Sequence, residues 1–399
     1  MRILYLAHRI PYPPTKGEKI RSFHQLRHLA KNHTVHLACL VDDPEDWQYR
    51  EQLQQYCASV DAVYRSKHAA KLLAAQALLS SHSFSVASFF SPVLQQAITQ
   101  LVQKEQIDCV FVSTIPMAEY VKHLDGLGKV IDYIDVDSEK WRQYATYHSF
   151  PFSWVYRREA ERLARYEEEA TTWFNHVLII SAAEAELLRQ RVRNRPISVV
   201  SNGVDLEYFT PCAQTLAESK RPIIVFTGVM DYFPNIDAVS YFCDTLLPLV
   251  HQELPSAEFL IVGRNPVGRV LQLGTRPGVT VTGSVPDVRP YLTQAAVVVA
   301  PFRLARGVQN KVLEAMAMGV PVVGTLSATQ GIAVTESDGV VVTDDPATFA
   351  QAVLRFLRGD ESARRQWARQ TRQYVERHHQ WDHMGIALEN ILRSVGDPA

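Results

Sequence analysis

The sequence predicts an α/β protein with two Rossmann-like domains, each a doubly wound parallel sheet, facing each other across a cleft. Its 399 residues exceed what one hydrophobic core usually organises, so two domains of ordinary size are expected. Short β-branched runs alternate with longer amphipathic runs, which is typical of parallel strands joined by crossover helices. A segment without periodicity divides this alternation into two series.

Two series of short apolar runs give the expected strands, with helices between them. In the first series the strands are expected at residues 2–7, 34–40, 109–113, 129–133, 177–180 and 197–200. In the second series they are expected at 223–228, 258–262, 279–282, 296–300, 321–324 and 339–342.

The segment between the two series, "LEYFTPCAQTLAESKRP", has no convincing period and carries prolines, as linkers do. We therefore expect an N-terminal domain at residues 1–205, a linker at 206–220 and a C-terminal domain at 221–378. The last helical pattern is interrupted near residues 378–381. Residues 379–399 are expected to form a helix that could cross back to the first domain.

Composition excludes several classes of protein. A formal net charge of −1 offers no global field for DNA or RNA, so nucleic-acid binding is not expected. The apolar run after Met1 is too short for a signal peptide, and no stretch reaches the ~20 apolar residues of a membrane-spanning helix. We expect a cytoplasmic protein, either soluble or peripheral on the inner face of the membrane. Five scattered cysteines suit reduced thiols better than disulfides or a zinc cluster: Cys39, Cys57, Cys109, Cys212 and Cys243.

A strand-to-helix corner in the second half carries a concentration of charge. The buried strand "VVVAPF" leads into a loop holding Arg303, Arg306 and Gly307, and then into the helix "VQNKVLEAMAM". Helical spacing places Gly307, Lys311 and Glu314 on one face. In parallel sheets, ligands collect beyond the carboxyl ends of strands, where this corner lies.

The charges at this corner suit a nucleotide diphosphate. Helix N-termini attract anions, and Arg303, Arg306 and Lys311 add positive charge there. Glu314 lies about one turn farther, where a carboxylate can accept two hydrogen bonds from a ribose diol. The alternative is that Lys311 and Glu314 form a weak surface pair. The apolar residues around Glu314 favour the binding role, because a carboxylate in such a helix needs a purpose.

At this point the sequence strongly resembles glycosyltransferase family 4, whose retaining enzymes have a GT-B fold. The resemblance covers nearly the whole chain and is densest at "FTGVMDYFPNIDAVSYF", "FLIVGRNP", "GVTVTGSVPDVRPYL" and "GVQNKVLEAMAMGVPVV". It is closest to the sugar transferases associated with exosortase (PEP-CTERM) exopolysaccharide loci. By this resemblance, the first domain lies on the acceptor side, and the second binds the nucleotide sugar.

The family's motif of two glutamates separated by seven residues is only half present. The second acid matches Glu314, whereas the first falls on Arg306. The resemblance then implies that contacts to the donor sugar pass to the backbone amides of Gly307, Val308 and Gln309.

The family's basic residues after the first strand of the second domain are also absent, since Val229 and Asn235 stand there. Phosphate charge would then be met by Arg303 and Lys311, with Arg264 after "IVG" as a further candidate.

The resemblance implies further contacts to the donor. Gly17 and Glu18, at a helix entry after the first strand, would approach the diphosphate from the other domain; the alternative is a plain proline-rich loop. Gly228 ends the first strand of the second domain. Val285 and Pro286 would present backbone groups to the base.

The stretch "IDYIDVDSEK" ends a strand with three acids. Its DVD triplet is similar to the metal-binding DxD of another transferase fold, but GT-B enzymes generally need no metal, so no metal site is expected. We expect one acid to face the sugar or the acceptor hydroxyl. Asp135 is the first choice and Asp132 the second. An equal alternative is that Ser138 caps the next helix, with Asp137 as its solvated neighbour.

Aromatic and arginine residues are mixed over residues 141–174. Such a surface suits the edge of a membrane that holds a lipid-linked acceptor. A solvated helix packed on its own domain is an equal alternative.

Together these features predict a retaining glycosyltransferase that moves a sugar from a nucleotide diphosphate sugar to a hydroxyl of a glycan or lipid-linked acceptor, in exopolysaccharide or cell-surface glycan synthesis. No tightly bound cofactor is expected. The alternatives are a nucleotide-sugar epimerase and a non-catalytic nucleotide-sugar-binding protein, the latter because Arg306 replaces an acid. A dehydrogenase is disfavoured, since no GxGxxG follows a strand.

Overall fold

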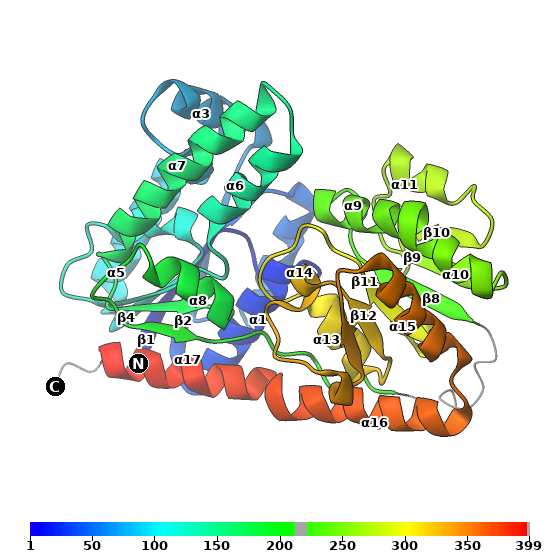
Figure 1. The fold of residues 1–399 in the computed structure, drawn as a ribbon. Helices are drawn as coiled ribbons and strands as arrows, with labels where there is room; N and C mark the ends of the chain where they lie inside the picture. Colours follow the sequence, from blue (N-terminus) through cyan, green and yellow to red (C-terminus); the bar gives the residue numbers. More distant parts are fainter. Residues whose placement is uncertain (212–221, 397–399) are drawn as a thin grey trace. The chain divides into compact units, whose positions relative to one another are not determined.

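Two separate parallel sheets form the framework of the protein (Figure 1). The structure is a computed structural model that describes residues 1–211 and 222–396. Within these residues the chain divides into two units. Unit 1 comprises Met1–Ser201 together with the C-terminal residues from Asp382, and unit 2 comprises Asn202–Trp381.

In the described residues, unit 1 holds a seven-stranded sheet in the order β3-β2-β1-β4-β5-β6-β7. Its central strands are apolar and buried on both faces, as parallel strands covered by helices must be. Ala7 lies opposite Cys39 and Ser113, so the carboxyl ends of β1, β2 and β4 share one edge. The strands are β1 (Arg2–Ala7), β2 (Thr34–Val41), β3 (Ser59–Tyr64), β4 (Cys109–Ser113), β5 (Gly128–Asp132), β6 (His176–Ile179) and β7 (Ile197–Val199).

Helices flank both faces of this sheet, several of them begun by a serine that caps the first turn (Figure 1). They are α1 (Gly17–Leu29), η1 (Pro44–Tyr49), α2 (Arg50–Leu53), α3 (Lys67–Leu79), α4 (Phe84–Ala87), α5 (Pro92–Glu105), η2 (Ile115–Val121), α6 (Asp137–Tyr147), α7 (Phe152–Thr171) and α8 (Ala182–Arg189).

Unit 2 holds a six-stranded sheet in its described residues, in the order β10-β9-β8-β11-β12-β13. The chain winds outward from β8 to β10 and then returns to β11 on the other side of β8. Such a reversal is the place where doubly wound sheets bind ligands. The strands are β8 (Ile223–Thr227), β9 (Glu258–Val262), β10 (Val279–Gly283), β11 (Val297–Ala300), β12 (Val322–Gly324) and β13 (Val340–Val342).

The helices of unit 2 alternate with these strands. They are α9 (Phe233–Tyr241), η4 (Phe242–Leu246), α10 (Leu247–Glu253), α11 (Gly268–Leu273), α12 (Arg289–Gln294), α13 (Asn310–Ala317), α14 (Leu326–Thr329), η5 (Glu336–Asp338), α15 (Pro346–Arg358) and α16 (Glu361–His378).

The C-terminal helix α17 (Trp381–Gly396) begins after a break in helical structure behind α16. From Asp382 onward it groups with unit 1. There Lys31 pairs with Asp382 at 3.1 Å, and a Cβ on Gly385 would lie 2.2 Å from the His28 ring. Close contact with unit 1 therefore requires a glycine in this helix.

The prediction of two doubly wound parallel sheets is confirmed, and every predicted strand is present with closely similar bounds. The sequence analysis missed β3, an edge strand in which Asp61 interrupts a short and partly exposed run. Of the linker predicted at 206–220, residues 212–220 lie outside the described residues, as does Cys212. No helix in the described part of the chain has the length and apolar character needed to cross a bilayer.

Candidate functional site

The corner after β11 in unit 2 is the most concentrated polar site of the predicted set. β11 is fully buried and ends at Ala300, and α13 begins at Asn310. Gly307 adopts a left-handed φ of 64°, which lets the loop turn back towards the helix. No side chain caps the first turn of α13, although the Val312 N–H donates to the Gln309 carbonyl at 2.9 Å, and the positive end of the helix can attract an anion there.

The ammonium of Lys311 lies on aromatic rings rather than beside an acid. It donates to Asn235 Oδ1 at 2.7 Å and lies 4.2 Å and 4.8 Å from the ring centroids of Phe226 and Phe302. Among the described residues, no carboxylate is within ion-pair distance of its Nζ. Burial lowers the pKa of Lys311 to about 7, although the Glu314 charge opposes this shift.

Glu314 lies almost one turn farther along α13, where it is half-buried. Its carboxylate accepts no hydrogen bond from the described residues. Burial raises the pKa of Glu314 to about 7, and the nearby Lys311 charge limits the rise. A basic and an acidic side chain whose pKa values are shifted by burial, each with few hydrogen-bond partners, are typical of a binding site for a polar ligand.

The backbone after two neighbouring strands, β8 and β9, is closely packed beside Lys311. Gly228 follows β8, and a Cβ there would lie 2.8 Å from both the Lys311 ammonium and the Asn235 amide. A Cβ on Gly263, after β9, would lie 1.6 Å from the Gly228 carbonyl oxygen, so only glycine fits. Asn235 also donates to the Val229 carbonyl at 2.9 Å and thus fixes the loop after β8. No local sequence pattern indicates these roles of Asn235 and Gly263.

A second glycine backs the turn at residues 307–309. A Cβ on Gly331 would lie 2.4 Å from the Gly307 carbonyl oxygen, so the two backbones touch. The Arg306 carbonyl accepts from Gln309 Nε2 at 2.9 Å, which closes the turn. Val308 is buried, whereas Arg306 and Gln309 are half-buried.

Two predicted phosphate ligands have protein partners in the structure. Arg303 donates to both oxygens of Asp237 and lies 5.0 Å from the Tyr241 ring centroid. The Arg264 carbonyl accepts from Met230 at 2.8 Å, which ties the loops after β8 and β9 together. Lys311 differs from Arg303 in this respect, because no carboxylate among the described residues lies within ion-pair distance of its ammonium.

The residues predicted to face the base, Val285 and Pro286, follow β10. The next side chains form a cluster in which Arg289 donates to Asp287 at 2.7 Å and lies 4.0 Å from the Tyr208 ring centroid. This cluster fixes the segment just after the predicted base contact.

In unit 1, Gly17 opens α1 and Glu18 pairs with Arg9 at 2.6 Å. Arg9 in turn pairs with Asp42 at 2.9 Å, at the carboxyl edge of the sheet. Burial lowers the pKa of the neighbouring His8 to about 3, so its ring is neutral. The sequence analysis missed His8 and Arg9, although "LYLAHRI" places both directly after the first strand.

The three acids after β5 differ in environment. Asp132 is fully buried and accepts from Arg21 Nε at 2.7 Å, Arg21 Nη2 at 3.1 Å and Gln25 at 2.6 Å. We correct its interpretation accordingly: its oxygens hold α1 and are not presented to a substrate. Asp135 and Asp137 are half-buried. No group of three or more acids, histidines or cysteines in residues 1–211 and 222–396 has the arrangement of a metal site.

Comparisons with known proteins agree with this organisation. A family model described as "Glycosyltransferase Family 4" matches residues 21–208, and one described as "Glycosyl transferases group 1" matches residues 221–359. A curated relative from Escherichia coli, UDP-Gal:alpha-D-GlcNAc-diphosphoundecaprenol alpha-1,3-galactosyltransferase, is 24% identical over 68% of this chain and 75% of its own.

Solved structures match over nearly the full length. Sucrose-phosphate synthase from Thermosynechococcus elongatus has a TM-score of 0.75 at 17% identity, covering 99% of this chain and 98% of its own. HepE from Anabaena, in complex with UDP and glucose, has a TM-score of 0.70 at 13% identity, covering 99% of this chain and 100% of its own. The predicted GT-B fold class is thereby confirmed.

Proposed function

We propose that the chain is a glycosyltransferase of the group 1, family 4 kind and that it transfers a sugar from a UDP-sugar to a hydroxyl acceptor with retention at the anomeric carbon; the two family models that match residues 21–208 and 221–359 support this. The observation that carries the donor assignment is the environment of Lys311. Its ammonium is buried against two aromatic rings, beside a helix N-terminus without a side-chain cap and without an acid partner among the described residues. A diphosphate supplies the missing negative charge.

Lys311 acts on the leaving group. As the glycosidic bond of the donor breaks, charge grows on the diphosphate, so a fixed cation stabilises the transition state more than the ground state. An arriving diphosphate raises the pKa of Lys311 again, and the ammonium is charged when it is needed. The backbone amides of Gly307, Val308 and Gln309 add donors where the family's first acid is replaced by Arg306.

Glu314 binds the ribose. Its carboxylate accepts no hydrogen bond from the described residues, so both oxygens can accept from a ligand. It lies almost one turn from Lys311, which matches the spacing between a diphosphate and the adjoining ribose. Val285 and Pro286 contact the base. Uracil is supported by the UDP found in the HepE complex and by the UDP-Gal donor of the Escherichia coli relative.

Unit 1 supplies the acceptor side. Asp135 faces the sugar or the acceptor hydroxyl, and the helix entry at Gly17 and Glu18 approaches the donor phosphates. Arg264 and Arg303 support the phosphate loops through the contacts described above. Asp132 keeps a positioning role through Arg21.

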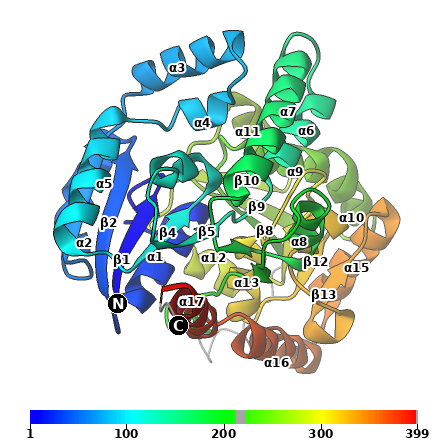
Figure 2. The ribbon, with the colours of Figure 1, turned by 90° about the vertical axis from the view of Figure 1, so that its left-hand side faces the viewer.

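The acceptor is a lipid-linked glycan of exopolysaccharide or cell-surface glycan synthesis, reached from the cytoplasmic face of the membrane. The turn between α6 and α7 exposes Phe150 (81%), and the first turn of α7 exposes Phe152 (59%) and Trp154 (52%), with Arg157 and Arg158 following. This aromatic tip lies at the end of unit 1 away from α17 (Figures 1 and 2). Apolar rings beside arginines suit an anionic lipid surface. Cosedimentation with anionic vesicles tests the contact, and equal binding by a Phe150→Ser/Trp154→Ser variant contradicts it.

Turnover of UDP-sugars with a lipid-linked acceptor tests the donor site. Glu314→Ala removes two charge-assisted hydrogen bonds of ~1.5–3 kcal/mol each, so kcat/KM is expected to fall by roughly two to four decades. The control Glu361→Ala, on the exposed side of α16, should leave turnover unchanged. Product analysis by NMR separates a transferred sugar from an epimer, and near-normal transfer by Glu314→Ala would contradict the assignment.

A further inference from the structure

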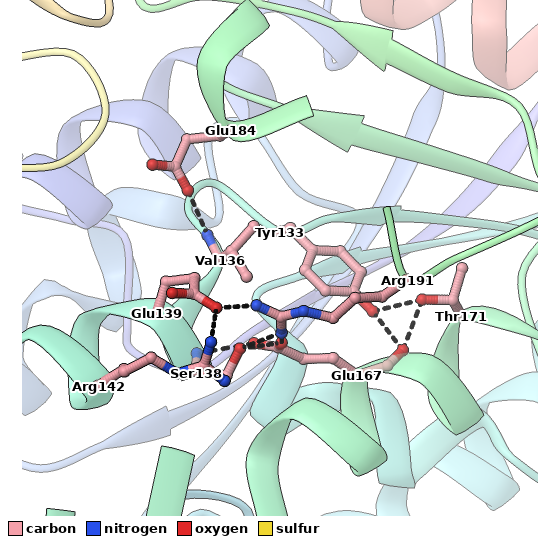
Figure 3. Close-up of polar contacts among 9 residues, drawn as sticks. All are labelled: Tyr133, Val136, Ser138, Glu139, Arg142, Glu167, Thr171, Glu184 and Arg191. Atoms are coloured by element: carbon pink, nitrogen blue, oxygen red, sulfur yellow. Dashed lines mark hydrogen bonds and ion pairs between the residues drawn. The ribbon is translucent and has the colours of Figure 1, made fainter. Parts of the chain in front are cut away.

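One short loop in unit 1 is held by three buried carboxylates. The loop, residues 133–138, joins β5 to α6 and carries Asp135. Alternate backbone N–H groups donate to the three acids: Ile134 to Asp132 at 3.1 Å, Val136 to Glu184 at 2.8 Å and Ser138 to Glu167 at 2.9 Å. The acids come from β5, α8 and α7, so three elements fix the course of the loop. Figure 3 shows the contacts of Glu184 and Glu167.

Glu167 uses both of its oxygens at the start of α6. Besides the Ser138 N–H, it accepts from Ser138 Oγ at 2.5 Å. The residue preceding α6 is Val136, whose side chain cannot cap a helix, so the acid from α7 does so instead. The helix start is thereby tied to α7 and not only to its own sequence.

Arg191, just after α8, extends the same cluster. It donates to Ser138 Oγ at 2.8 Å and lies 3.5 Å from Glu167 Oε2. It also donates to Glu139, which pairs with Arg142 at 3.1 Å (Figure 3). Hydrogen bonds from Glu167 in α7 and from Arg191 after α8 therefore hold the first turn of α6 in place.

Glu167 is held away from solvent. Glu167 is 1% exposed, and burial, with a smaller effect from the Asp137 and Glu184 charges, raises its pKa to about 8 against the lowering effect of the Ser138 hydrogen bonds. An ordinary serine or aspartate at the residue before α6 would cap the helix without burying an acid. A buried acid whose hydrogen bonds fix a loop beside a reacting group is typical of a residue that positions that group.

We propose that Glu167 is a positioning residue for transfer, which sets the place of Asp135 by holding Ser138 at the start of α6, with Arg191 as its partner. This inference rests on the proposed role of Asp135. It predicts that weakening these contacts lowers kcat while leaving the affinity for UDP, whose proposed Lys311 and Glu314 contacts lie in unit 2, unchanged.

The test compares three variants with a matched control. Glu167→Leu removes both acceptors, Glu167→Gln keeps one carbonyl oxygen, and Ser138→Ala removes only the hydroxyl. A misplacement of the loop by about 1 Å is expected to lower kcat by about 100-fold in Glu167→Leu and by about 10-fold in the other two. Glu168→Gln, on the exposed side of the same helix, should behave as wild type. The Kd for UDP, measured by calorimetry, should stay constant throughout.

A double-mutant cycle with Asp135→Asn separates positioning from general damage. In the Asp135→Asn background, Glu167→Gln should cause little further loss of kcat, because the group it positions is already disabled. An equal loss in both backgrounds overturns the inference, as does wild-type kcat in Glu167→Gln or a parallel loss of UDP affinity. If Glu167→Leu does not fold, the Gln and Ala variants decide alone. A wild-type kcat in Asp135→Asn would overturn the role of Asp135 and this inference with it. The proposed donor site would be unaffected, because Glu314→Ala tests it separately.

Discussion

The loop after β5 in unit 1 and the corner after β11 in unit 2 treat buried charge in opposite ways. Each lies beyond the carboxyl end of a parallel strand. In the first, Asp132 accepts hydrogen bonds from Arg21, Gln25 and the Ile134 N–H. In the second, Lys311 has one amide oxygen and two rings, and Glu314 accepts no hydrogen bond from the described residues.

This difference separates structural charges from binding charges. A buried ion with a full set of partners is stable in the empty protein and offers nothing to a ligand. A buried ion with few hydrogen-bond partners destabilises the empty protein, and a ligand that supplies such partners relieves that penalty on binding. Both sets look alike in sequence, as acids and bases at strand ends.

The largest effect is expected from breaking the buried ion pair of Arg21 and Asp132 in unit 1. Arg21→Met leaves Asp132 buried without its cation, so the free energy of unfolding should fall by about 3–5 kcal/mol. The exposed pair of Arg276 and Asp244 is the control, since loss of a surface ion pair costs at most about 1 kcal/mol. Urea unfolding of Arg21→Met and Arg276→Met measures both. Equal losses would show that the Arg21 pair is not a structural support.

The next effect concerns ligand affinity in unit 2. Lys311→Met removes a charge-assisted contact of ~1.5–3 kcal/mol, so UDP affinity should fall by about 10- to 150-fold. Arg303→Met should cost less, because Asp237 already neutralises that arginine. Calorimetry of UDP binding to the two variants measures which of them loses more affinity. A larger loss for Arg303→Met would reverse the assignment of the two cations.

The smallest effect is a gain in stability. Lys311→Met replaces a buried cation with a flexible apolar side chain that suits aromatic neighbours, so the ligand-free protein should gain about 1 kcal/mol. Thermal unfolding without ligand measures it. A loss of stability would mean that the ammonium supports the empty fold.

The gain should depend on pH. The pKa of Lys311 is lowered from 10.5 to about 7 in the folded protein, so the unfolded chain binds an extra proton between these values. The buried charge of Lys311 therefore lowers the free energy of unfolding of the wild type most below pH 7, and this loss fades as pH rises. The stability gained by Lys311→Met fades with it. Without Lys311, Glu314 is also harder to ionise, which acts in the same direction. A gain that grows above pH 7 would contradict this account.

Local patterns predicted much of the fold and one half of the site. The strands followed from apolar runs, and the neighbourhood of Lys311 and Glu314 followed from helical spacing within one segment. The contact of Arg21 with Asp132 joins residues 111 positions apart, and periodicity carries no information about such a pair. For that reason a buried structural acid was interpreted as a catalytic candidate.

The same limit explains the other omissions. Asn235 meets Lys311 across 76 positions, and the need for Gly263 comes from the Gly228 carbonyl of another loop. The edge strand β3 was missed because its exposed residues do not form an apolar run. Each of these features depends on which strands become neighbours in the sheet, and that is fixed by the whole chain.

The central claim is that burial lowers the pKa of Lys311 to about 7, so that its amine is only partly protonated in the empty protein and becomes fully protonated when a diphosphate binds. Calorimetry of UDP binding at pH 8, in buffers with different ionisation enthalpies, counts the protons taken up. We expect uptake approaching one proton per UDP in the wild type and none in Lys311→Arg, whose side chain is charged in both states. Full UDP affinity without proton uptake in the wild type, or equal uptake in Lys311→Arg, would contradict the account.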